Sequence, residues 1–160
     1  MHVEPTKQHA WLRKFLGEWT STAAMNCQPG EPEITTTGSE SVRALGDLWI
    51  VADGRGEMPG GGQASMMLTI GYDPARERFV GTWIGSMMTH LWTYTGQLDA
   101  AGKVLTLECE GPNFESPGST CNYRDVHEFI SDDERTLTSY VQAPDGSWNK
   151  MMTATYRRKK

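Results

Sequence analysis

The segment "YRDVHEFI", residues 123–130, places a phenol, a carboxylate and an imidazole at alternate positions. In an extended strand alternate side chains share a face, so Tyr123, Asp125 and His127 lie on one side and Arg124 on the other. Whichever face is inward carries an ionisable group, and a buried ionisable group must be paired or must bind something. An imidazole beside a carboxylate also suits general acid–base catalysis. The alternative interpretation is an exposed strand with ordinary cross-strand pairs.

A second set of candidates is apolar and begins in "GTWIGSMM", residues 81–88. Trp83 and Met87 share one face of an extended strand there. Flexible thioethers suit an adaptable cavity, although filling an irregular core is their default role. The alternating glycines indicate a barrel corner or, alternatively, the close approach of a ligand. We expect the following residues to contact a ligand, with Arg124 or His127 as the polar anchor: Trp83, Met87, Trp92, Arg124, His127 and Tyr140.

Metal and cofactor motifs are absent from the sequence. The four histidines show no His-x-His or His-Glu-x-x-His spacing, and Cys27, Cys109 and Cys121 show no Cys-x-x-Cys spacing. A haem-binding barrel would need an axial histidine near its last strands, and none follows His127. No Gly-x-Ser-x-Gly or phosphate-binding loop occurs either. We therefore expect no metal and no cofactor, and we name no catalytic residue.

Composition narrows the class of partner. The chain has 160 residues and a net charge of -5, with no basic face for a nucleic-acid backbone. We expect no nucleic-acid partner. No stretch has the length of a signal peptide core or a membrane span. The odd number of cysteines argues against a disulfide framework, so we expect a cytoplasmic protein that does not contact a membrane.

One helix and about ten strands are expected to position these residues. Apolar residues of segment 6–16 follow a helical period, with Thr6 suited to the N-cap and Gly17 to the C-terminal end. After Gly17 the period is two, and turn signals such as Asp145-Gly146 recur. The predicted strands are residues 18–25, 34–43, 48–57, 65–72, 78–86, 90–98, 104–110, 123–130, 136–142 and 148–157.

Short loops without helices between the strands predict an antiparallel meander, and closure into a barrel hides both of its edges. We therefore predict an all-β fold: a single up-and-down β-barrel domain over residues 1–160. Residues 1–5 are expected to be flexible, 6–16 helical, and 18–158 the barrel. The longest loops, residues 26–33, 58–63 and 111–120, are candidates for the mouth of the barrel.

Two resemblances support this architecture. Gly17-Glu18-Trp19, at the entry from helix to strand, resembles the motif at the closed end of lipocalins, where the indole plugs the floor of the barrel. "LGEW", "ALGDLWIVADGRGEMPGG", "GYDPARERFVGTWIGSMM", "TYTGQLDAAGKVLTL" and "DGSWNKMMTATYRR" together resemble the largely bacterial family called domain of unknown function 1579. The family resemblance implies a compact calycin-like β-domain and carries over no catalytic residue.

Three functions are consistent with the sequence. The leading one is a binding protein that holds a small apolar or amphipathic molecule inside the barrel. The second is an enzyme that uses the same cavity, with His127 as acid or base beside Asp125 or Tyr123. The third is a filled barrel that acts through a homodimer or partner surface. A cavity would favour the first two, and a filled interior the third.

Overall fold

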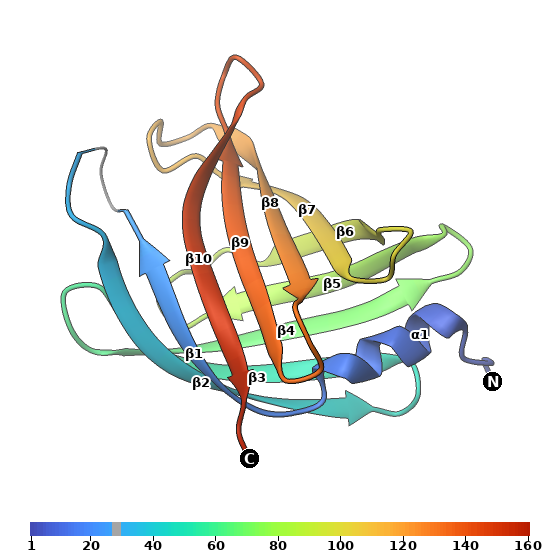
Figure 1. Cartoon of the computed structure of the whole chain (residues 1–160). Helices are drawn as coiled ribbons and strands as arrows, with labels where there is room; N and C mark the ends of the chain where they lie inside the picture. The colour runs from blue at the N-terminus through green and yellow to red at the C-terminus, as the bar shows by residue number, and fades with distance from the viewer. Residues whose placement is uncertain (27–29) are drawn as a thin grey trace.

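A closed antiparallel β-barrel, preceded by a short helix, makes up the fold (Figure 1). The computed structural model describes residues 1–26 and 30–160. Within these residues the helices are α1 (Lys7–Leu12) and the 3₁₀ turn η1 (Arg13–Phe15). The ten strands are β1 (Gly17–Met25), β2 (Ile34–Leu45), β3 (Trp49–Glu57), β4 (Gln63–Asp73), β5 (Arg78–Gly85), β6 (Trp92–Leu98), β7 (Val104–Pro112), β8 (Thr120–Phe129), β9 (Glu134–Gln142) and β10 (Trp148–Arg158).

Each strand pairs with its neighbour in the sequence, and β1 pairs with β10 to close the sheet. The predicted up-and-down barrel of about ten strands with one N-terminal helix is therefore confirmed. Cys27 and the centre of the predicted loop 26–33 lie outside the described residues. Among the described residues, no helix combines the length and the apolar character needed to cross a membrane.

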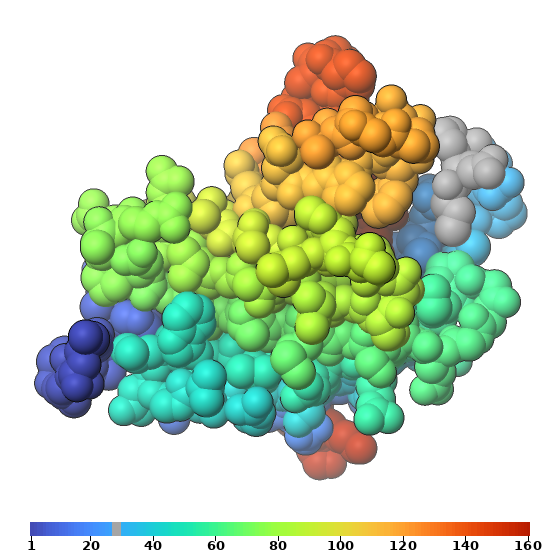
Figure 2. Space-filling model, turned by 180° about the vertical axis from the view of Figure 1, so that it is seen from behind, coloured from blue at the N-terminus to red at the C-terminus, as the bar shows by residue number. Residues whose placement is uncertain are grey.

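The two rims of the barrel differ. The rim beside α1 carries the turns β2–β3, β4–β5, β6–β7 and β8–β9, whereas the opposite rim carries the connections β3–β4, β5–β6, β7–β8 and β9–β10 (Figure 1). The predicted mouth loops 58–63 and 111–120 belong to that second rim. From behind, side chains of the cyan to yellow strands form a continuous wall, and the β9–β10 turn projects beyond it (Figure 2). The helix thus closes one end and leaves the other for access.

The helix is fixed to the barrel by its own first turn. The backbone N–H of Thr6 donates to His9 Nδ1 (2.9 Å), so the other ring nitrogen, Nε2, donates to the carbonyl of Tyr72 (3.0 Å). The predicted helix over residues 6–16 is α-helical only to Leu12. The helix then continues as the 3₁₀ turn η1, in which the N–H of Leu16 donates a hydrogen bond to the carbonyl of Arg13, three residues earlier (3.1 Å).

Trp19 forms the centre of the closed end. Its side chain is 1% exposed, and its Nε1–H donates to the carbonyl of Phe15 (2.8 Å). Arg158, the last residue of β10, lies over the Trp19 ring at 4.2 Å and donates to the carbonyl of Leu16. The sequence resemblance to a plugged barrel floor therefore has a direct physical counterpart. Phe15, Leu12 and Phe129 complete the apolar layer.

The glycine of "GTW" serves the packing of the barrel wall. A Cβ on Gly81 would lie 2.2 Å from the carbonyl oxygen of Thr69 on the neighbouring strand. A methyl group cannot be accommodated at that distance from backbone. At Gly81 the close approach is therefore to the backbone of the neighbouring strand.

We expect Gly81→Ala to lower the free energy of unfolding by about 2 kcal/mol or more, because the strand must move to admit the methyl group. Gly54→Ala is the matched control: its Cβ would meet only Met66, at 3.6 Å or more, and should cost less than about 1 kcal/mol. Urea unfolding followed by tryptophan fluorescence measures both. Equal losses for the two variants would contradict the assignment.

Candidate functional site

A cavity of about 270 Å³ occupies the interior of the barrel between the floor and the open rim. Apolar side chains dominate its surface, and a few polar groups are set among them. Phe114, in the β7–β8 connection, is 66% exposed and also lines the cavity, which places the mouth at the open rim. The remaining lining residues are Glu40, Leu68, Trp83, Met88, Trp92, Tyr94, Cys109, Tyr123, Asp125, His127, Arg135, Leu137, Ser139, Met151, Met152 and Tyr156.

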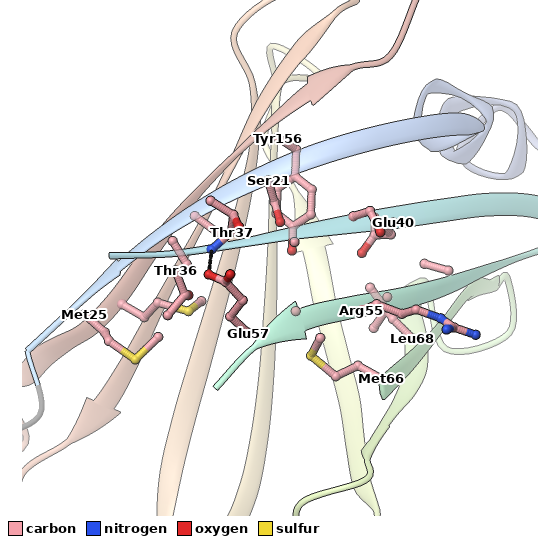
Figure 3. A pocket seen from close by; sticks show the side chains of 18 residues that line it. Ser21, Met25, Thr36, Thr37, Glu40, Arg55, Glu57, Met66, Leu68 and Tyr156 are labelled. Carbon is pink, nitrogen blue, oxygen red and sulfur yellow. Dashed lines mark hydrogen bonds between the residues drawn. The ribbon is translucent and has the colours of Figure 1, made fainter. Parts of the chain in front are cut away.

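A smaller space of about 130 Å³ adjoins this cavity and shares Glu40, Leu68, Met152 and Tyr156 with it. Figure 3 shows this compartment, with Met25 and Met66 among its labelled side chains. Glu57 lies there too, and its carboxylate accepts from the backbone N–H of Thr37 (3.1 Å). Small residues such as Ser21 and Ala154 line much of it. The smaller space thus extends the interior toward β1 to β3, whereas the larger cavity lies against β5 to β9.

Strand β8 sets the polar groups at successive depths. It starts at the open rim, so Tyr123 lies nearest the mouth, Asp125 midway and His127 deepest, before Phe129 joins the floor. The alternate residues face outward. Of the two orientations open at the sequence level, the face with Tyr123, Asp125 and His127 is the inward one.

Asp125 is the polar centre of the cavity. Its Oδ2 accepts a hydrogen bond from Tyr94 OH (2.7 Å), and its Oδ1 accepts one from Ser139 Oγ (2.7 Å). Burial raises the pKa of Asp125, and the two hydroxyl donors offset part of that effect. Burial and the nearby carboxylate also raise the pKa of Tyr94, which keeps its hydroxyl protonated as the donor. The trio is preorganised to present carboxylate oxygens to the cavity.

His127 is 2% exposed and lies edge-on to Phe15, with ring centroids 5.8 Å apart. Its Nδ1 has no protein partner within the described residues. Burial first, and then the charge of Arg135, lower the pKa of His127 to about 3. The imidazole is therefore neutral at physiological pH, and its buried Nδ1 makes no hydrogen bond to the described residues.

A buried ion pair forms part of the cavity lining. The guanidinium of Arg135 binds the carboxylate of Glu40, and the Arg135 side chain is only 1% exposed. The guanidinium carbon lies over the rings of Trp19 (4.6 Å) and Tyr156 (4.1 Å). Removing the carboxylate partner of a buried guanidinium leaves an uncompensated charge in the interior, which strongly destabilises the folded protein.

Three of the six residues expected to contact a ligand line the cavity: Trp83, Trp92 and His127. Trp83 and Trp92 are direct cross-strand partners, so their rings form adjacent parts of one wall. Arg124 lies on the outer face, where it donates to Glu108 (2.8 Å) and stacks over Trp148 (4.1 Å). Tyr140 is the cross-strand partner of Arg124 and does not line the cavity.

Met87 also lies outside the cavity lining and is 38% exposed. The alternation that groups it with Trp83 ends with β5 at Gly85, so the next residues follow loop geometry. Met88 lines the cavity instead, and its sulfur accepts from Trp92 Nε1 (3.1 Å). A bulge in β10 at Met151 similarly turns both Met151 and Met152 to the cavity, although regular alternation predicts only one.

Four polar residues of the site were missed by sequence reasoning. Tyr94 had a usable signal, because it lies two positions after Trp92 and so shares its face. Ser139, Glu40 and Arg135 had none, since Glu40 and Ser139 lie in polar-looking strands and Arg135 follows a run of turn residues. Within residues 1–26 and 30–160, no three His, Cys, Asp or Glu side chains are grouped as metal ligands.

The strand order and the interior space define a small closed β-barrel with a cavity of molecular size. The chain belongs to the family described as "Protein of unknown function (DUF1579)", whose model matches residues 4–158. The family resemblance seen in the sequence is confirmed. A comparison with curated proteins found no match.

Two solved structures show the same fold. Rv2717c from M. tuberculosis is 13% identical, with a TM-score of 0.64 over 98% of this chain and 100% of that one. The barrel EF1p2_mFAP2b, bound to DFHBI, is 11% identical, with a TM-score of 0.51 over 94% of this chain and 98% of that one. At these identities the likeness concerns the fold alone.

We expect Glu40→Gln to lower the free energy of unfolding by about 3 kcal/mol, because it leaves the buried Arg135 charge without its counter-ion. Glu108→Gln is the matched control. It breaks the exposed pair with Arg124 and should cost less than about 1 kcal/mol. Chemical denaturation of both variants measures the difference, and similar costs would contradict a structural role for the buried pair.

His127 should make stability depend on pH. Its pKa is about 3 when folded and 6.5 as the ordinary value, so between these values the unfolded chain binds a proton that the folded chain does not. Stability should fall as pH falls from 6 to 4, by about 1.4 kcal/mol per pH unit from this group.

His127→Gln removes that contribution, so its stability should vary less steeply with pH than that of the wild type. Denaturation curves at several pH values measure both slopes, and their difference isolates His127 from the carboxylates. Parallel slopes would show that His127 titrates normally.

Proposed function

We propose that this protein binds a small apolar or amphipathic molecule inside its barrel. The observation that carries the proposal is the cavity of about 270 Å³, in which apolar walls surround a few fixed polar groups. Binding sites for small molecules have this composition, and their volumes start at roughly 300 Å³. The adjoining space of about 130 Å³ provides further room.

The wall residues support this proposal by their chemistry. Trp83 and Trp92 give flat apolar surfaces, and Met88, Met151 and Met152 give side chains that adapt to the shape of a ligand. The exposed ring of Phe114 stands at the mouth. A ligand entering past Phe114 would bury its apolar body against the two indoles.

The polar groups support it by their incomplete hydrogen bonding. Asp125 has further acceptor positions beyond those used by Tyr94 and Ser139, and Nδ1 of His127 has no protein partner among the described residues. Unused polar groups in an apolar interior favour a bound molecule with matching groups. The fold is shared with EF1p2_mFAP2b bound to DFHBI, and that likeness is compatible with a ligand inside a barrel of this topology.

Catalysis by His127 has less support. A histidine with a pKa of about 3 is a weak proton acceptor at neutral pH, and a general base works best with a pKa near the working pH. Action through a dimer surface has no specific observation in its favour. That function was expected of a barrel with a filled interior, and this barrel contains a cavity.

Titration with the uncharged fluorescent dye N-phenyl-1-naphthylamine tests the proposal. We expect saturable binding to the wild type, with enhanced fluorescence as the dye leaves water. Cys109→Phe should weaken binding at least about tenfold, because the added ring fills the cavity. Glu110→Phe puts the same ring on the exposed outer face of the same strand and should change affinity less than about threefold.

Two outcomes would contradict the proposal. Absence of dye binding to the wild type, or equal binding by both phenylalanine variants, would argue against an interior site. Thermal unfolding of each variant must show a folded protein at the temperature of the titration.

A further inference from the structure

We propose that the ligand of the cavity carries a cationic, hydrogen-bond-donating group, such as a protonated amine, that pairs with Asp125. The inference rests on the proposed binding function and narrows it to one chemical class: a small organic cation with an apolar or aromatic body. It is carried by the contacts of Asp125, by the charges that surround the cavity, and by the aromatic walls.

The hydrogen bonds of Asp125 leave it an acceptor. Each carboxylate oxygen receives one hydroxyl, from Tyr94 (2.7 Å) or from Ser139 (2.7 Å). An ionised carboxylate offers about four acceptor positions, so roughly two stay free on a group that lines the cavity. A ligand that donates a hydrogen bond matches these positions, whereas a ligand carboxylate would place acceptor against acceptor.

The charges around the cavity favour the same sign of ligand. Arg135 is compensated by Glu40, with which it forms the buried ion pair. His127 is neutral at physiological pH. Among the described residues, no Lys, Arg or His lies within ion-pair distance of Asp125. Asp125 is therefore the one acidic group in this lining without a counter-ion of its own. Because burial raises its pKa, a bound cation would both supply the counter-ion and hold the carboxylate in its ionised form.

The walls near Asp125 suit a cation as well. Trp92 and Tyr123 lie edge to face, with ring centroids 4.9 Å apart, and Trp83 is the cross-strand partner of Trp92. The faces of indole and phenol rings attract cations, and this attraction grows when water is excluded. A carboxylate with aromatic rings beside it is a combination that recognises ammonium groups.

Arg135 is the competing anchor, because its Nε lacks a protein partner within the described residues. An anionic ligand could approach that atom. However, the guanidinium is enclosed by the rings of Phe15, Trp19 and Tyr156 and already holds Glu40. Reaching it would require an anion to pass Asp125 and to compete with a carboxylate already in place. The geometry favours Asp125.

Three probes with one aromatic body and different head groups test the inference: 1-naphthylmethylamine, 1-naphthylmethanol and 1-naphthoic acid. Calorimetric titration of the wild-type protein at neutral pH gives the three affinities. We expect the amine to bind at least about tenfold more tightly than the alcohol, and the acid to bind weakest. This order needs no variant. Tightest binding by the acid, or equal binding by all three, would overturn the inference.

Asp125→Asn tests the anchor itself. It should reduce affinity for the amine to about that for the alcohol and leave the alcohol within about threefold of its wild-type value. Glu128→Gln removes the same charge from the outward face of the same strand and should preserve the preference for the amine. An amine preference that survives Asp125→Asn would overturn the assignment of Asp125.

The two proposals fail in distinguishable ways. Binding of N-phenyl-1-naphthylamine without a head-group preference would overturn the cation inference and leave the binding function intact. If neither the dye nor any of the three probes binds, the proposed function fails and the inference fails with it.

Discussion

The pairing of β1 with β10 is the constraint on which the rest of the molecule depends. The two strands are matched from Trp19 with Arg158 to Met25 with Met152, and this contact converts an open meander into a closed barrel. Closure removes both sheet edges and gives every inward position a neighbour across the interior. Glu40 on β2 can reach Arg135 on β9 only because β1 and β10 join the two halves of the sheet.

The interior that results is asymmetric. Large rings such as Trp83, Trp92 and Tyr123 line the side of β5 to β8, and small residues such as Ala23 and Gly54 line the side of β1 to β4. At the floor, Trp19 and its neighbours form a buried apolar cluster. The cavity is thus bounded below by the helix and on one side by aromatic walls. The polar groups project into it at fixed heights set by the register of β8.

The sequence predicted the architecture closely because its signals are local. Period-two patterns and turn residues place most strand ends within a few residues, and the helix before Gly17 is marked by its own period. The positions of site residues depend on information that is not local. Whether Asp125 or Arg124 faces inward is decided by pairing with β7 and β9, and both faces of this strand carry charge.

Irregularities in the strands explain other differences. Met87 leaves the predicted face because β5 ends two residues earlier, and Met151 joins the cavity because β10 has a bulge. The Glu40–Arg135 pair could not be foreseen, because its partners are 95 residues apart and neither has a neighbouring motif. Sequence reasoning therefore named the two indoles and His127, which line the cavity, and it described the Asp125 face only as one of two alternatives.

The contact of Arg158 with the helix has a consequence for how the chain folds. Arg158 bonds the carbonyl of Leu16 across a separation of 142 residues and covers Trp19 from above. The floor therefore cannot reach its final packing until the last strand has docked. Folds with many such distant contacts form slowly, because the chain loses the entropy of closing a long loop before the stabilising contacts form. Docking of the last strand therefore completes two things at once: the packing over the indole of Trp19 and the pairing of the free edge of β1.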